Sequence, residues 1–176
     1  MTLDKFTIKA QEAIQAAVAL ASRNSQQVIE PLHILAGAME KGKDVVNYLF
    51  HKSGINLQVV ESAVQNEVSR LPKVSGGEPY FSPDANKVMQ TTMSESQKMG
   101  DEFVSIEPLL LALLTVNSTA RRILKDAGCT EQTMSAAITE LRHGAKVQTQ
   151  RGAETYQALS KYARNLVEDA RAGKLD

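Results

Sequence analysis

The tetrapeptide Ile-Glu-Pro-Leu occurs twice in this chain of 176 residues, at 29–32 and again at 106–109. The second copy begins 77 residues after the first, and each copy opens an apolar run. Two further pairs of segments match: 6–10 with 81–85 at an offset of 75, and 49–54 with 123–128 at an offset of 74. Offsets that differ so little predict one duplicated unit with short insertions. The chain is therefore a tandem repeat, which constrains its fold more than any other feature.

Each repeat is predicted to form four helices. Thr7 and Ser82 are capping residues that precede helical runs, and Pro83 suits the first turn of a helix. The runs at 32–39 and 109–116 are too apolar for surface helices, so we expect them in the centre of the fold. The first helix of the first repeat carries a stripe of alanines, which allows a neighbouring helix to approach closely.

Particular residues mark where these helices begin and end. Glu30 and Glu107 are expected at helix N-termini, where a negative charge is favoured by about 0.3–1 kcal/mol. Gly54 and Gly128 are expected to end the third helix of each repeat in the left-handed conformation. Residues 72–79, which include two prolines and two glycines, are the predicted connector between the repeats.

The predicted fold class is all-α, because no pair of strands with turn chemistry is visible. We expect two tandem four-helix repeats, at about 4–71 and 80–142, packed as one pseudo-two-fold symmetric domain over 1–143. In that arrangement 7–71 and 82–142 should superpose. The residues expected to be buried between the halves are Leu35, Ala36, Leu113 and Leu114.

The end of the chain has a different character. Residues 144–152 carry a glycine at each end and no apolar period, which predicts a flexible linker. Residues 153–176 are predicted to contain one C-terminal amphipathic helix, with Tyr156, Leu159 and Leu166 on its apolar face. This helix has no partner within the repeats.

Charge and cysteine content limit the classes of function. Lys plus Arg and Asp plus Glu both number 20, and the balance holds locally, so a nucleic-acid-binding surface is not expected. Cys129 is the single cysteine and matches Ile55 of the other repeat, which predicts a small buried hydrophobic residue. The chain shows no signal peptide and no apolar run long enough to span a bilayer. We expect a soluble cytoplasmic protein with no membrane partner.

Catalytic and cofactor motifs are absent from the sequence. There is no phosphate-binding loop, no dinucleotide fingerprint and no nucleophile elbow. His33, His51 and His143 are scattered, and His33 follows Leu32 in an apolar run, which favours a packing role. No Cys/His set has the spacing of metal ligands. The segment is therefore not expected to be an enzyme or to hold a cofactor or metal.

The duplicated unit, with its 53–56 (Ser-Gly-Ile-Asn) and 100–105 (Gly-Asp-Glu-Phe-Val-Ser) segments, resembles the Clp N-domain of the Hsp100/Clp AAA+ unfoldases. The tail at 158–166 and 173–176 is similar to the segment that leads into the first ATPase module in the ClpB-type disaggregases of that family. The resemblance covers the whole chain. It implies an N-terminal domain with its linker, from a protein that continues into ATP-binding modules.

The resemblance also implies a function and a set of site residues. N-domains of this family recruit unfolded or aggregated polypeptides and pass them to a hexameric ring. The positions that match the client-binding surface are Thr7, Asp101 and Glu107, with Met89 and Leu109 as apolar neighbours. Each also has a structural interpretation: a helix cap for Thr7, a loop carboxylate for Asp101, a helix N-terminal charge for Glu107, and core for the other two. The two carboxylates would favour clients that carry Lys or Arg.

Partners and cofactors follow from the same resemblance. The full-length protein would be hexameric, would use ATP and magnesium, and would work with a DnaK-type chaperone system, while this segment alone would be monomeric. The alternative is an adaptor-docking module of the ClpA/ClpC type, which feeds a protease. Those relatives usually carry Thr-Glu-His where this chain has Ile-Glu-Pro, and their tails differ.

Overall fold

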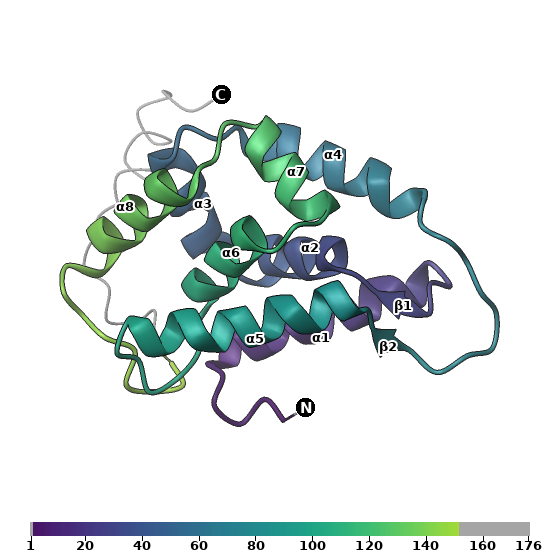
Figure 1. The fold of residues 1–176 in the computed structure, drawn as a ribbon, viewed down its shortest axis with the longest axis horizontal. Coiled ribbons are helices and arrows are strands. Elements are labelled where there is room, and N and C mark those ends of the chain that lie inside the picture. Colours follow the sequence, from purple (N-terminus) through teal and green to yellow (C-terminus); the bar gives the residue numbers. More distant parts are fainter. Residues whose placement is uncertain (1, 152–176) are drawn as a thin grey trace, which may run out of the picture.

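A computed structural model describes residues 2–151, which form eight helices and two very short strands. The first half contains α1 (Ile8–Arg23), β1 (Val28–Ile29), α2 (Pro31–Lys41), α3 (Lys43–Lys52) and α4 (Leu57–Ser69). The second half contains β2 (Tyr80–Phe81), α5 (Pro83–Lys98), α6 (Ile106–Thr115), α7 (Thr119–Asp126) and α8 (Glu131–Arg142). The predicted all-α class is confirmed (Figure 1).

The residues predicted to begin and end helices occupy those positions in the structure. Thr7 caps α1 by accepting a hydrogen bond from the amide of Ala10 at 3.2 Å, and Ser82 caps α5 by accepting one from Ala85 at 3.0 Å. Gly54 and Gly128 follow α3 and α7 with φ of +73° and +97°, the left-handed conformation that glycine adopts without steric cost.

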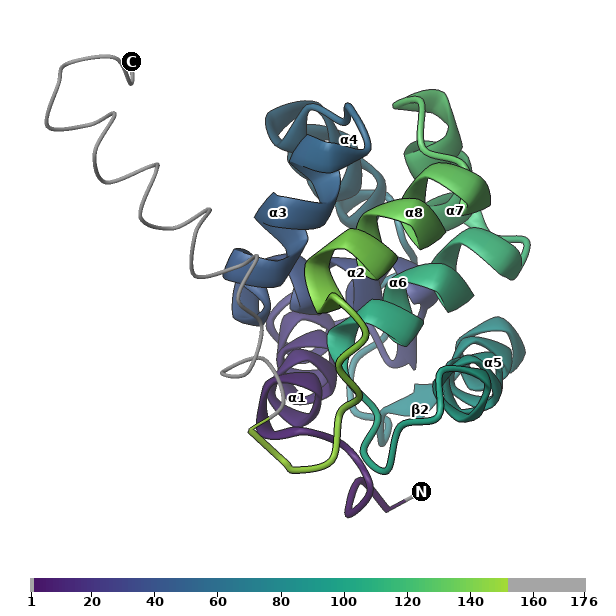
Figure 2. The same ribbon diagram turned by 90° about the vertical axis from the view of Figure 1, so that its left-hand side faces the viewer.

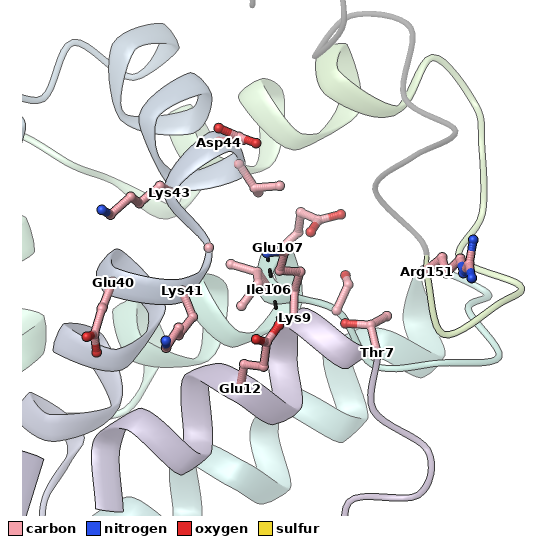
Figure 3. A pocket seen from close by; sticks show the side chains of 13 residues that line it. Thr7, Lys9, Glu12, Glu40, Lys41, Lys43, Asp44, Ile106, Glu107 and Arg151 are labelled. Atoms are coloured by element: carbon pink, nitrogen blue, oxygen red, sulfur yellow. Dashed lines mark ion pairs between the residues drawn. The ribbon is translucent and has the colours of Figure 1, made fainter. Parts of the chain in front are cut away.

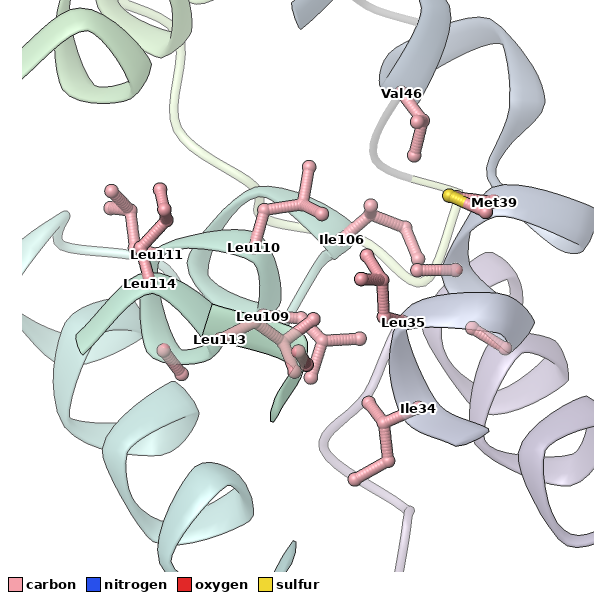
Figure 4. Close-up of a cluster of buried hydrophobic side chains, with 14 of the residues drawn as sticks. Ile34, Leu35, Met39, Val46, Ile106, Leu109, Leu110, Leu111, Leu113 and Leu114 are labelled. Atoms are coloured by element: carbon pink, nitrogen blue, oxygen red, sulfur yellow. The ribbon is translucent and has the colours of Figure 1, made fainter. Parts of the chain in front are cut away.

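The two apolar central helices, α2 and α6, lie in the middle of the molecule. They are flanked by α1 and α5 on one side and by α3, α4, α7 and α8 on the other (Figure 2). Leu35 of α2 and Leu113 and Leu114 of α6 are fully buried, and the central side chains of the two helices point toward one another (Figure 4). Ala36 differs from the prediction because it is only partly buried, at the edge of the core.

The two halves contact each other in a reciprocal pattern. α2 contacts α6, α3 contacts α8, and α4 contacts α7, so an exchange of the halves converts the last two pairs into each other. β1 pairs in parallel with β2, and Phe6 pairs in parallel with Val104. Phe6 and Phe81 precede the equivalent helices α1 and α5, and their partners Val104 and Ile29 precede the equivalent helices α6 and α2. An exchange of the halves therefore converts these two pairings into each other. A two-fold axis would produce this pattern; superposition of 7–71 on 82–142 stays a prediction.

The two parallel pairings were not predicted from the sequence. β1 and β2 are two residues long each and come from opposite sides of the connector. No local turn joins them, and two residues are too few to show the alternation of a strand. They hold the segments before α2 and α5 side by side.

The helices α1 and α2 pack closely because small residues face each other. Gly37 lies on α2, and a Cβ atom added there would overlap the carbonyl oxygen of Ala13 and come within 3.0 Å of the amide nitrogen of Ala17. Both alanines are fully buried. The alanine stripe therefore allows the close approach that the sequence predicts.

We expect Gly37→Ala to lower the free energy of unfolding by about 1–3 kcal/mol, since the backbone of α1 must move to admit one methyl group. Urea denaturation followed by circular dichroism measures this change. Gly77→Ala is the control, because the three atoms nearest to a Cβ at Gly77 all belong to the end of the Gln27 side chain, which can rotate away. Equal stability of Gly37→Ala and the parent would show that the two helices are not in close contact.

The segment after α8 packs on the domain in a way that its composition did not suggest. Val147 is buried, and its backbone pairs with the loop between α5 and α6. The expected linker at 144–152 is thus attached to the domain over part of its length. The helix predicted within 153–176 lies outside the described residues. None of the helices in residues 2–151 is long and apolar enough to cross a membrane.

Candidate functional site

A pocket of about 370 Å³ opens where three parts of the fold meet. The beginning of α1, the junction of α2 and α3, and the beginning of α6 form its walls (Figure 3). Its lining residues are Thr7, Lys9, Glu12, Glu40, Lys41, Gly42, Lys43, Asp44, Val45, Ser105, Ile106, Glu107 and Arg151. We call it the α1–α6 pocket. It brings together Thr7 and Glu107, two of the residues that the resemblance predicts for client binding.

Thr7 and Glu107 each stand at the beginning of a helix. Thr7 is 4% exposed and caps α1, so its structural interpretation is confirmed, and it also lines the pocket. Glu107 lies in the first turn of α6, where the helix dipole favours its negative charge. Its residue is 1% exposed. Both residues line the pocket (Figure 3).

A buried arginine joins Glu107 to Asp101. Arg142, the last residue of α8, donates from Nε and Nη2 to Oε1 of Glu107 at 3.2 and 3.1 Å. Its Nη1 and Nη2 donate to the two carboxylate oxygens of Asp101 at 2.8 and 2.9 Å. Nη2 also donates to the hydroxyl of Ser105 at 3.1 Å. The side chains of Arg142, Asp101 and Glu107 are 6%, 0% and 2% exposed, so water screens these charges little.

This arrangement changes the expected role of Asp101. Its carboxylate faces Arg142 and accepts a further hydrogen bond from the amide of Val147 at 3.0 Å. Because the side chain is 0% exposed, it cannot meet a lysine or arginine of a client in this conformation. Asp101 is therefore not among the residues that line the α1–α6 pocket, whereas Glu107 lines it although its side chain is only 2% exposed.

Met89 and Leu109 are part of the hydrophobic core. Met89 on α5 is 0% exposed and Leu109 on α6 is 1% exposed. Neither lines the α1–α6 pocket. Both therefore have the core placement of their structural interpretation.

The pocket carries no dominant charge. Four of its lining side chains are cationic and four are anionic: Lys9, Lys41, Lys43 and Arg151 against Glu12, Glu40, Asp44 and Glu107. Lys9 and Glu12 pair with each other at 4.0 Å (Figure 3). The formal charges of the lining side chains therefore cancel, so the net charge of the pocket does not by itself favour cationic clients.

His33 has the packing role that the sequence favours. Its Nδ1 accepts the amide proton of Glu30 at 2.9 Å, and its Nε2 lies 2.7 Å from Oε1 of Gln26. Gln26 in turn donates to the carbonyl of Val68 at 2.6 Å. These partners fix a neutral imidazole that carries its proton on Nε2. Burial lowers the pKa of His33 to about 4.

Cys129 is also buried, at 1% exposed, and burial raises the pKa of its thiol to about 11. A thiol with a raised pKa holds little of the reactive thiolate at neutral pH, so the prediction of a small buried hydrophobic residue is confirmed. Within residues 2–151 no group of three or more His, Cys, Asp or Glu residues is arranged to hold a metal ion.

The sequence of the chain matches a known family of domains. Residues 5–127 match the family of the Clp repeat (R) N-terminal domain. The whole chain is 54% identical to part of the chaperone protein ClpB of Bacteroides thetaiotaomicron and 47% identical to part of ClpB of Porphyromonas gingivalis. It spans about 20% of the length of each of these relatives.

A solved structure shares the fold. The N-terminal domain of Hsp104 from Candida albicans aligns with a TM-score of 0.76 and 24% sequence identity. The alignment covers 85% of this chain and 99% of that domain. This chain and that domain therefore share the arrangement of helices described above.

Proposed function

The chain belongs to the Clp repeat N-terminal domain family and resembles ClpB chaperones over its whole length, and we propose that it recruits unfolded or aggregated polypeptides for disaggregation. The observation that carries this proposal is the open α1–α6 pocket, which Thr7 and Glu107 both line although they lie 100 residues apart in sequence. Both are residues that the family resemblance predicts for client binding. Thr7, Glu107 and the polar rim are the proposed client-contacting groups, with Asp101 supporting them.

The size and chemistry of the pocket support weak, broad recognition. A volume of about 370 Å³ holds a few side chains of an extended segment, and the mixed charges of its wall accept both signs. Association costs of roughly 4–15 kcal/mol offset most of what such a small contact gains, so micromolar or weaker affinity is expected. Several such domains around one ring would raise the apparent affinity without new contacts.

The remaining functions are proposed for the longer protein. The relatives are about five times as long as this chain, and we propose that their additional length supplies the ATPase modules, which bind ATP and magnesium and thread the recruited polypeptide. We further propose a hexameric assembly in the cytoplasm that cooperates with a DnaK-type chaperone system. No catalytic role is proposed for this segment.

We expect Thr7→Ala and Glu107→Gln each to weaken client binding about fivefold, the loss of roughly one hydrogen bond. The measurement is fluorescence anisotropy of labelled casein, a natively unfolded protein, titrated with the 176-residue chain. Glu107→Gln keeps the shape of the side chain and an oxygen for Arg142.

Ser82→Ala is the matched control for Thr7→Ala. Ser82 caps α5 as Thr7 caps α1, both are nearly buried, and Ser82 does not line the α1–α6 pocket. Loss of either cap costs about 1 kcal/mol of stability, which thermal unfolding measures. If both pocket variants fold and bind casein like the parent, the client site lies elsewhere and the adaptor-docking alternative gains.

A further inference from the structure

Residues 145–150, which follow α8, form a segment that we call the strap. Val147 anchors it with a side chain that is 1% exposed. The amide of Val147 donates to Oδ1 of Asp101 at 3.0 Å, and its carbonyl oxygen accepts from the amides of Glu102 and Phe103 at 2.9 and 3.3 Å. Nζ of Lys146 also donates to the carbonyl of Met99 at 3.0 Å, so one buried side chain and four hydrogen bonds attach the strap to the loop between α5 and α6.

The far end of the strap reaches the beginning of α1 (Figure 2). The carbonyl oxygen of Gln150 accepts from the amide of Ile8 at 2.9 Å, and the side chain of Gln150 donates to the carbonyl of Asp4 at 3.3 Å. Ile8 directly follows Thr7, and Arg151 directly follows the strap and lines the α1–α6 pocket. The strap therefore helps to fix one wall of the pocket.

A second connection runs through the buried charges. Val147 is bonded to Asp101, Asp101 to Arg142, and Arg142 to Glu107, which borders the pocket. Neither Val147 nor Asp101 lines the pocket. Release of the strap would remove the amide of Val147 as a donor to Asp101, which also accepts two hydrogen bonds from Arg142. Two independent routes, one through Gln150 and one through Arg142, link the strap to the same pocket.

We propose that docking of the strap and occupancy of the α1–α6 pocket by a client favour each other, with Asp101 acting as a positioning residue; this rests on the proposed client-binding function. The docked strap holds the wall and Glu107 in place for the client. By linkage, a client that binds the assembled pocket stabilises the docked strap to the same degree.

The consequence concerns the path of the chain out of the domain. A flexible linker of nine residues at 144–152 would allow a span of roughly 15–18 Å. When the strap is docked, residues 145–150 no longer contribute to that span, and Arg151 is held at the pocket wall. Client occupancy would thereby shorten and orient the connection between this domain and whatever follows it.

The test combines hydrogen exchange with client binding on the 176-residue chain. Val147→Ala and Asp101→Asn should speed amide exchange in peptides that cover the strap and should weaken casein binding about fivefold or more. Bound casein should slow exchange of the same peptides in the parent. Gln148→Ala is the matched control, since Gln148 lies in the strap and its side chain is exposed. Val147→Ile should retain both parental properties.

The outcomes separate the coupling from the function on which it rests. If the strap variants release the strap but bind casein like the parent, or if bound casein leaves exchange of the strap unchanged, the coupling is wrong while client binding stands. If the parent itself does not bind casein, the proposed function fails and the coupling fails with it. Should Asp101→Asn not fold, Val147→Ala decides alone, because it alters no charge.

Discussion

Replacing Arg142 with methionine is expected to lower the free energy of unfolding by about 3–5 kcal/mol, because it leaves two buried carboxylates without their cation. Asp101 and Glu107 are 0% and 2% exposed at the side chain, so water cannot take over the role of the guanidinium. Methionine is a long, flexible side chain that fills much of the vacated space, so the loss reports mainly the charges. Urea denaturation followed by circular dichroism measures it.

An exposed arginine provides the control for this prediction. Arg122 pairs with Glu67 at 3.4 Å and with Asp126 at 3.7 Å, and its side chain is 55% exposed. Arg122→Met should therefore cost no more than about 1 kcal/mol. The triple variant Arg142→Met, Asp101→Asn, Glu107→Gln should recover part of the loss, since it removes the unpaired charges. A cost for Arg142→Met as small as that for Arg122→Met would show that the buried network is not formed.

The free energy of unfolding is also expected to fall by about 3 kcal/mol as the pH drops from 6.5 to 4, through His33 alone. Burial lowers the pKa of His33 from 6.5 to about 4 in the folded state. Between these values the unfolded chain binds a proton that the folded chain excludes. The contribution of His33 is therefore fully present above pH 6.5 and is lost progressively toward pH 4.

Comparison with a variant that cannot titrate isolates this effect. His33→Asn removes the titrating group, while His51 and His143 are exposed and unchanged in both proteins. Denaturant unfolding at pH 7, 5.5 and 4.5 gives the pH dependence of each protein. The parent should lose more stability than His33→Asn across this range, whatever the absolute cost of the substitution. Parallel pH profiles would mean that His33 is accessible to protons in the folded state.

The helices were predictable because their signals are local. A cap such as Thr7, a proline at the first helical position and a glycine with positive φ each act within one turn of the chain. The duplication then indicated that two similar units share one core. The parallel pairing of β1 with β2 was not predictable, because it joins segments separated by three helices and the connector.

The site could be predicted only in part, for a physical reason. Thr7 and Glu107 came from the family resemblance, and the fold brings them to one pocket. Arg142 was missed because a charged residue at the end of an amphipathic helix normally lies in solvent, and its two partners are more than 30 residues away. Val147 was missed because one valine between polar residues shows no apolar period. Burial of a single side chain depends on tertiary contacts that a local pattern does not contain.

The most direct test of the account is a nuclear magnetic resonance titration of the isotopically labelled 176-residue chain with unlabelled casein. Client binding at the α1–α6 pocket predicts that the amide signals of Thr7, of residues 42–45 and of Ser105 to Glu107 shift or broaden first, followed by those of the strap. Perturbations confined to another surface, such as the groove lined by Val18, Tyr80 and Phe81, would contradict it.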